Sequence, residues 1–443
     1  MPFDITQTYD IRTLTAEIDE LAEDGRVRQR FDAFSRWRIY PGQNGKVYQL
    51  RSANCPHRPD DEGYYLTNLV LQGGGTLGLA HAGFIFGLER AGFRFPAIAG
   101  TSAGAIVAAG LFAARGNNIL AETGPTLVDL VGDVPMDTFV DGPRTIRRIV
   151  RRFAAKRSIK HPMYIPGLFA TFRQLLRKRG INSGLAFEMW MSKTLTELGL
   201  SKTNHFTTRM KTIAHDLAAA DCPDGLNPFS SNLDPDTMLK LISTAMPTGM
   251  KFALPRDLRL LHPEYADVSP ARMVRMSMSI PLFFEPCVLR TNPSEWRNQI
   301  IKEYAPFVTN QTAWEMAELD ALTFLDGGLF SNLPTDELTA EMSDDIGCIS
   351  APLVRDPESV QIINARSLRG LVSDAFAVFE AIRLQRDRDA HSRIIRDAKA
   401  NRGILKIDTG PANWLNFAMD NTQKEDLFLR GLQRVRDYML MGV

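Results

Sequence analysis

Residues 64–114 read YYLTNLVLQGGGTLGLAHAGFIFGLERAGFRFPAIAGTSAGAIVAAGLFAA and decide the fold. The apolar run 65–71 predicts a buried strand that ends at a glycine turn, and residues 79–90 predict a helix after that turn. A second strand is expected at 95–99 and a second helix at 105–114. Strand, turn and helix in alternation are typical of βαβ units, which build a parallel sheet with covering helices.

The second turn, residues 100–104, is a candidate site for a nucleophile. It reads Gly-Thr-Ser-Ala-Gly and matches G-x-S-x-G between a strand and a helix. A nucleophilic hydroxyl has to stand exposed on a turn so sharp that only small neighbours fit, and Gly100 and Gly104 leave that room. The following helix points the positive end of its dipole at the Ser102 oxygen. The alternative is a connection in which Ser102 only caps the helix.

The first turn, residues 73–78, reads GGGTLG and lies at the end of its own strand. Successive glycines let backbone N–H groups converge on an anion. The run also satisfies the dinucleotide fingerprint G-x-G-x-x-G, but residues 95–99 end in no Asp or Glu to hold a ribose. A Walker-type phosphate loop would need Lys in place of Leu79. We therefore expect an oxyanion hole beside Ser102, the alternative being a turn with only a packing role.

A serine is a weak nucleophile and needs a neighbouring base. Asp326 follows the apolar run 322–325 and precedes Gly327 and Gly328, which let the chain turn closely around it. Taken alone, Asp-Gly-Gly is a common turn.

Two histidines are competing candidates for the base. His391 would complete the chain order Ser, Asp, His of an α/β-hydrolase triad, but it lies in the charged stretch 386–393, which is typical of a solvated helix face. His81 follows the glycine loop and is expected to pack within its helix. The remaining histidines show no spacing of metal ligands, and no metal site is expected.

In this order the motifs resemble the patatin-like phospholipase family. The positions that carry the resemblance are Gly73, Gly74, Gly75 and Gly78, then Gly100, Ser102 and Gly104, then Asp326, Gly327 and Gly328 with Asn332 and Pro334. Residues 275–286, RMSMSIPLFFEP, resemble the family's stretch before its catalytic aspartate, and residues 179–184 resemble another landmark. The resemblance covers about residues 64–340. Several ordered motifs are more specific than any one of them.

The resemblance implies a Ser–Asp dyad without histidine, in which Ser102 attacks an ester carbonyl and Asp326 takes its proton. Amides of Gly74, Gly75 and Thr76 would hold the oxyanion, and water activated by Asp326 would release the fatty acid from the acyl-enzyme. No cofactor and no metal are implied, so the activity would be a calcium-independent phospholipase A-type hydrolysis. The family often has Arg or Lys where this chain has Leu77, which weakens any role of a basic loop residue in binding phosphate.

The implied fold is a three-layer α/β arrangement with a central, mainly parallel sheet and extra helical segments at both ends. We expect a helical extension over 1–63, a catalytic domain over 64–345, and a C-terminal strand and helices over 346–443 packed on the same domain. Apolar residues at helical spacing predict a surface helix that includes residues 14–21. Further strands are expected at 47–50, 211–214, 322–325 and 346–349.

One stretch breaks the balance of charge. Residues 144–179 contain twelve Lys or Arg and no Asp or Glu. Their first part interleaves Arg147, Arg148, Arg151 and Arg152 with apolar residues at helical spacing, a pattern that suits an anionic lipid surface. The alternatives are a helix packed into the protein with solvated arginines, or a site for an acidic partner protein or an activating anionic ligand.

The overall composition limits the possible partners and the cellular compartment of the protein. A net charge of +1 does not favour nucleic acid as a partner. The four cysteines are scattered, which fits a reducing compartment. No signal peptide and no membrane-spanning run is expected, so we predict a cytoplasmic protein that visits phospholipid membranes peripherally, with secretion by another route left open. Two further functions stay open: a broader esterase or neutral lipase, and a catalytically silent lipid- or nucleotide-binding regulator.

Overall fold

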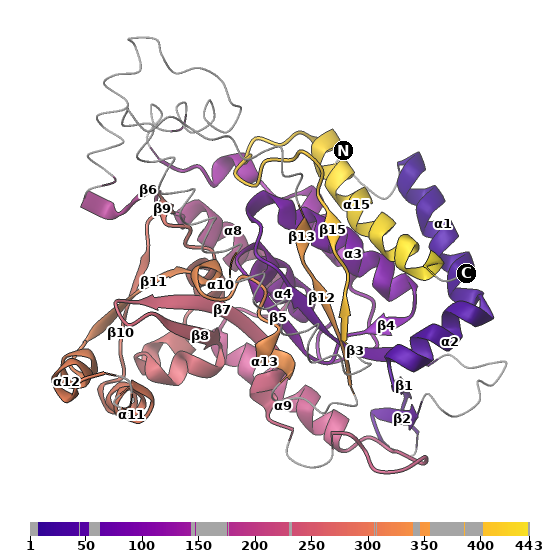
Figure 1. The fold of residues 1–443 in the computed structure, drawn as a ribbon, viewed down its shortest axis with the longest axis horizontal. Helices are drawn as coiled ribbons and strands as arrows, with labels where there is room; N and C mark the ends of the chain where they lie inside the picture. The colour runs from indigo at the N-terminus through magenta and orange to yellow at the C-terminus, as the bar shows by residue number, and fades with distance from the viewer. Residues whose placement is uncertain are drawn as a thin grey trace, which may run out of the picture.

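The computed structural model describes residues 8–43, 45–52, 63–142, 177–229, 233–304, 308–339, 346–354 and 402–441, together with the single residues 147, 175, 306 and 385. Within these ranges a large mixed sheet is flanked by helices (Figure 1). None of the described helices is both long enough and apolar enough to cross a bilayer.

The centre of the sheet is parallel and its edges are antiparallel. The parallel strands are β14 (Arg402–Ile404), β12 (Gly347–Ala351), β3 (Tyr64–Leu71), β5 (Ile98–Thr101) and β7 (Leu239–Met246), adjacent in this order. The antiparallel strands are β8 (Met250–Leu254), β11 (Ala321–Asp326) and β10 (Cys287–Arg290) beyond β7, and β1 (Trp37–Pro41) and β2 (Tyr48–Ser52) beside the start of β3. Because β3 and β5 are parallel neighbours, the two turns that follow them meet at the same edge of the sheet.

Strand β3 shows why this chain builds a covered sheet. All of its residues after Tyr64 are buried, which is typical of a central strand with side chains packed on both faces. Beyond β3 the chain continues into a short 3-10 turn, η2 (Gly75–Gly78), and helix α3 (Leu79–Arg90), and beyond β5 into α4 (Ala103–Ala114). The predicted βαβ order over 64–114 and the mainly parallel sheet are confirmed.

Helix α3 packs against the C-terminal helix α15 (Asn421–Leu440), and α1 (Tyr9–Glu23) lies beside α15 (Figure 1). The two backbones of α3 and α15 touch, because a Cβ atom on Gly83 would lie 1.9 Å from the carbonyl oxygen of Phe428. A Cβ on Gly431 would lie 2.0 Å from the carbonyl oxygen of Ala80. Glycine on both helices therefore sets how closely α15 holds the helix that follows the glycine loop.

Eight further helices complete the described part of the fold. They are α2 (Gly25–Phe34), α5 (Gly124–Gly132), α8 (Leu185–Glu197), α9 (Thr203–Ala218), α10 (Ala271–Ser277), α11 (Pro293–Tyr304), α12 (Asn310–Ala317) and the short α13 (Asp336–Thr339). Short strands pair as β4 (Phe93–Arg94) with β3, β6 (Gly180–Asn182) with β9 (Leu282–Phe284), and β13 (Leu353–Val354) with β15 (Ile407–Asp408).

The predicted strands at 47–50, 322–325 and 346–349 are confirmed as β2, β11 and β12. The strand predicted at 211–214 is wrong, because these residues lie within α9. Met210, Ile213, Ala214 and Leu217 are buried there at the three- and four-residue spacing of one helix face, which a four-residue window could not reveal.

The leading segment joins the rest of the chain closely. Ile11 and Ile18 of α1 are buried while Arg12 and Thr13 between them are exposed, so the predicted surface helix is confirmed and packs its apolar face on the protein. Strand β1 pairs with the start of β3, and β12 pairs with its end. The boundaries at 63 and 345 stay predictions, but segments on both sides of them complete one sheet.

Candidate active site

Ser102 stands on a strained turn between β5 and α4. Its backbone has φ +52° and ψ −117°, a region that non-glycine residues rarely adopt and that costs about 1–3 kcal/mol. The turn is tight because a Cβ on Gly104 would lie 2.3 Å from the carbonyl oxygen of Leu71. Ser102 occupies the N-cap position of α4, but its side chain makes no capping hydrogen bond. The capping alternative therefore does not describe this serine.

The Ser102 hydroxyl donates instead to Asp326. Its Oγ lies 2.6 Å from Oδ2 of Asp326, and both side chains are buried. The other carboxylate oxygen, Oδ1, accepts from the backbone N–H of Gly328 at 2.7 Å in the short turn η8 (Gly327–Leu329). That second bond orients the carboxylate so that Oδ2 faces Ser102. The structure thus brings together two residues that lie more than two hundred positions apart in the chain.

Helix α10 and the residues after it fix both members of this pair. Ser277 Oγ accepts from the backbone N–H of Ser102 at 2.9 Å and donates to the carbonyl of Ile242, which lies in the middle of β7. The carbonyl of Ser279 accepts from the backbone N–H of Asp326 at 2.9 Å. Sequence reasoning did not assign these two serines a role, although both lie in the stretch 275–286 that carried the family resemblance.

Arg275 is a third residue of this stretch to which the motifs assigned no role. Its side chain is buried, donates to Ser279 Oγ at 2.6 Å and to the carbonyl of Ser183 at 2.9 Å, and also donates to the carbonyl of Glu285. The guanidinium lies over the ring of Phe284, 5.2 Å from its centroid. It therefore ties the segment that supports Asp326 to the landmark at 179–184, where Gly184 leaves room for the guanidinium.

The glycine loop lies against the serine turn. A Cβ on Gly73 would be 3.1 Å from Cβ of Ser102. The backbone N–H groups of Gly74 and Gly75 make no hydrogen bond to any atom of the described residues. The N–H of Thr76, in contrast, donates to the carbonyl oxygen of Trp414 at 2.9 Å. Of the three amides expected to form the oxyanion hole, the structure leaves those of Gly74 and Gly75 available and engages that of Thr76.

His81 is buried next to this loop and is not positioned as a base. Its Nε2 lies 2.9 Å from the carbonyl of Gln72, to which it can only donate, and its Nδ1 has no partner within the described residues. Burial lowers the pKa of His81 from 6.5 to about 4, because an imidazolium would place a second N–H in the core without an acceptor. His391 lies outside the described residues.

This histidine makes stability depend on pH. The folded-state pKa is the lower one, so the unfolded chain binds more protons between about pH 4 and pH 6.5, and stability falls as pH drops through that window. The shift of the His81 pKa from 6.5 to about 4 makes the folded state less stable by about 3 kcal/mol below this window than above it. The test is to measure the unfolding free energy of the wild type and of His81→Gln by urea titration at about pH 7 and about pH 4.5. Both proteins should lose stability at the lower pH, and we expect the loss to be about 2–3 kcal/mol smaller in His81→Gln, which has no imidazole to protonate. Equal falls in the two proteins would show that His81 is not buried in its neutral form.

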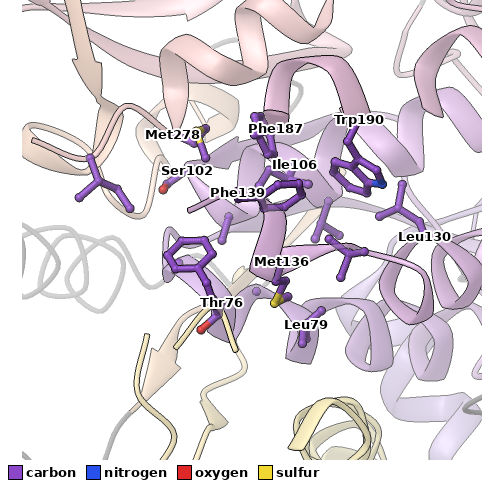
Figure 2. Close-up of a pocket in the computed structure, with 17 residues that line it drawn as sticks. Thr76, Leu79, Ser102, Ile106, Leu130, Met136, Phe139, Phe187, Trp190 and Met278 are labelled. Atoms are coloured by element: carbon purple, nitrogen blue, oxygen red, sulfur yellow. The ribbon is translucent and has the colours of Figure 1, made fainter. Parts of the chain in front are cut away.

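An apolar pocket opens beside Ser102 and contains about 640 Å³ of empty space, part of it continuous with solvent. Figure 2 shows Ser102 next to a group of rings, Phe139, Phe187 and Trp190, with Ile106 of α4 between them. Of the described residues that line the pocket, only Thr76 and Ser102 have polar hydroxyls, and none is charged. Such an apolar lining suits a hydrocarbon chain.

The chain is similar to a known protein family over more than half of its length. Residues 69–339 match the patatin-like phospholipase family. The chain belongs to this family. The patatin-like match begins within β3 and ends at α13, so it spans the glycine loop, Ser102 and Asp326 but neither α1 nor α15.

Two individual proteins are similar over most of this patatin-like chain. The uncharacterized protein YqhO of Bacillus subtilis (strain 168) is 26% identical over 373 residues, which cover 84% of this chain and 97% of YqhO. The crystal structure of VipD from Legionella pneumophila matches with a TM-score of 0.41 and 14% identity, over 92% of this chain and 70% of VipD.

The four arginines predicted to contact a membrane surface lie between α5 and β6 in the chain. Arg147 is a half-buried residue in helical conformation, and Arg148, Arg151 and Arg152 lie outside the described residues. In the part of the chain that the structure describes, no group of three or more His, Cys, Asp or Glu side chains is arranged to hold a metal ion.

Proposed function

We propose that this protein is a serine lipid acyl hydrolase of phospholipase A type that works through Ser102 and Asp326. The observation that carries the proposal is the 2.6 Å hydrogen bond between the Ser102 hydroxyl and the Asp326 carboxylate, on a strained turn beside an apolar pocket. Membership of the patatin-like phospholipase family supports lipid ester hydrolysis as the reaction class.

In the first half of the reaction, Asp326 Oδ2 accepts the proton of Ser102 as Oγ attacks the carbonyl carbon of the ester. The negative charge that develops on the carbonyl oxygen is held by the amides of Gly74 and Gly75, with the N-terminal end of α4 adding its positive dipole. The C–O bond then breaks, the proton passes from Asp326 to the leaving alcohol, and the acyl group stays on Ser102.

In the second half, a water molecule takes the place of the alcohol. Asp326 accepts a proton from this water, the hydroxide attacks the acyl carbonyl, and the same amides hold the charge again. Ser102 leaves with its proton restored, and the fatty acid is released. One carboxylate therefore acts twice, and the hydrogen bond from Gly328 keeps it aligned for both steps.

The pocket favours an acyl chain as the group that is bound next to Ser102. Its lining contains no charged side chain within the described residues, so it offers nothing to a phosphate head group. Head-group recognition would then occur outside the pocket. Rates on phospholipid vesicles, triglyceride emulsions and a short-chain ester, with liberated fatty acids measured by mass spectrometry, distinguish a phospholipase from a neutral lipase or broad esterase. The proposal requires phospholipid to be cleaved and Ser102→Ala to release no fatty acid from it.

We expect chelators to leave the activity unchanged. In the proposed mechanism, backbone amides stabilise the oxyanion, a task for which other lipid hydrolases use a calcium ion. Initial rates on phospholipid vesicles, measured with and without an excess of EDTA or EGTA, should agree within about twofold. A loss that added calcium restores would contradict the metal-independent mechanism.

Access to an insoluble substrate requires a visit to the membrane surface. The twelve basic residues over 144–179 supply positive charge for an anionic surface, and this membrane role remains part of the proposal. A catalytically silent regulator with the same fold is the competing function. Reaction of the folded protein with a fluorophosphonate separates the two, because only an activated serine forms the covalent adduct.

A further inference from the structure

The segment Asn413–Phe417 lies far beyond the end of the family match at residue 339, yet it contacts the glycine loop directly. The carbonyl of Asn413 accepts from the hydroxyl of Thr76 at 3.1 Å, and the carbonyl of Trp414 accepts from the N–H of Thr76 at 2.9 Å. Two hydrogen bonds to one residue fix both the backbone and the side chain of Thr76.

The same segment leaves no space at Gly75. This glycine has φ +57°, and a Cβ on it would lie 2.2 Å from the carbonyl oxygen of Trp414. A side chain at this position would therefore push the segment away from the loop. The backbones of Gly75 and Trp414 are therefore in direct contact. This contact fixes the position of the C-terminal segment relative to the amides of Gly74 and Gly75, which are available for an oxyanion.

Phe417 extends this contact into the pocket. Its ring is one of the side chains that line the pocket beside Ser102, and it is 8% exposed. It stacks on Phe283, with ring centroids 5.0 Å apart and planes 15° apart, and meets the edge of Phe284 at 6.1 Å. The ring is thus held from behind by the segment that also supports Asp326.

Helix α15 anchors the segment. Asp420 caps this helix with a full capping box, so the chain between Phe417 and α15 has little freedom. Lys424, in the first turns of α15, donates to the carbonyls of Gly132 and Val134 at 3.1 and 3.2 Å. Val134 also lines the pocket, so α15 holds two parts of its wall.

We infer that Phe417 is a specificity-determining residue for the acyl group of the substrate. It belongs to a C-terminal segment that lies outside the family match and packs against the active site. This inference rests on the proposed function, because it assigns the pocket to the acyl chain of the ester. The ring forms part of the pocket wall, so its size sets how long an acyl chain the pocket accepts beside Ser102. The hydrogen bonds of Asn413 and Trp414 with Thr76 hold this part of the pocket wall in a fixed position relative to the proposed oxyanion hole.

The test compares Phe417→Leu, which widens the pocket, with Phe417→Trp, which narrows it. The readout is the ratio of kcat/KM for p-nitrophenyl palmitate to that for p-nitrophenyl octanoate. We expect Phe417→Leu to raise this ratio and Phe417→Trp to lower it, each by roughly fivefold, as small changes in an apolar pocket do. Phe428→Leu is the matched control, since Phe428 is a buried phenylalanine of α15 that packs on Phe86 and does not line the pocket.

The control should lose stability without changing the ratio. If both Phe417 variants keep the wild-type ratio, or shift it no more than Phe428→Leu does, the inference is overturned. A wild-type protein that cleaves no ester would instead refute the proposed function. In that case the rise in Tm of each variant on addition of octanoic or palmitic acid measures its preference for chain length. Opposite shifts of this preference in the two Phe417 variants support the role of Phe417. An unchanged preference overturns it.

Discussion

Replacement of Ser102 by alanine should abolish ester hydrolysis, with kcat falling by at least about 10⁴-fold. No neighbouring group can substitute for the attacking oxygen, because the acyl-enzyme forms on that atom. The variant should fold normally, since the Ser102 hydroxyl makes no capping bond to α4 and donates only to Asp326. Release of fatty acid from phospholipid vesicles by matched amounts of the two proteins measures the effect.

Removal of the hydroxyl leaves the rest of the site in place, which makes the result easy to interpret. The apolar pocket and the amides of Gly74 and Gly75 do not depend on Ser102 Oγ, so Ser102→Ala should still bind a fatty acid as the wild type does. Residual hydrolysis above about a hundredth of the wild-type rate, in a variant free of contaminating esterase, would mean that another residue is the nucleophile.

Replacement of Asp326 by asparagine should lower kcat by about 10³- to 10⁴-fold. Asparagine has nearly the same shape and can keep the hydrogen bond from Gly328 through its amide oxygen, but it cannot accept the proton of Ser102. The loss should therefore appear in kcat, and KM should change little. Steady-state kinetics on a soluble nitrophenyl ester measure the two quantities separately.

His391→Ala is the comparison that distinguishes a dyad from a triad. The hydrogen bond from Ser102 to Asp326 is direct, so no imidazole is needed between them, and this variant should keep the wild-type kcat. A His391→Ala protein as impaired as Asp326→Asn would replace the dyad with a Ser-His-Asp arrangement.

The sequence predicted those parts of the molecule that depend on local pattern. Each apolar run over 64–114 is bounded by glycine turns, so strand and helix alternate in a way that has few interpretations. At 211–214 the window was too short, because four residues cannot separate a strand from one face of a longer helix. Asp326 could be linked to Ser102 only through the family resemblance, since nothing in Asp-Gly-Gly itself indicates a base.

Contacts between distant segments could not be predicted in this way. The expected role of the Thr76 amide depends on Trp414, more than three hundred residues further along the chain, whose carbonyl already accepts from it. Phe417 belongs to no recognisable motif, and its place in the pocket follows from the packing of α15 on α3. Arg275 could have been noticed in the stretch 275–286, but its burial and its partners depend on the tertiary fold.

The most direct test of the central claim is the reaction of the folded protein with an alkyl fluorophosphonate, followed by peptide mass spectrometry. The shared proton between Ser102 and Asp326 predicts one adduct, located on Ser102, that is absent in Ser102→Ala and forms at least about a hundredfold more slowly in Asp326→Asn. Labelling of a different residue, no labelling of Ser102 in a folded wild-type protein, or an equal rate in Asp326→Asn would contradict the account.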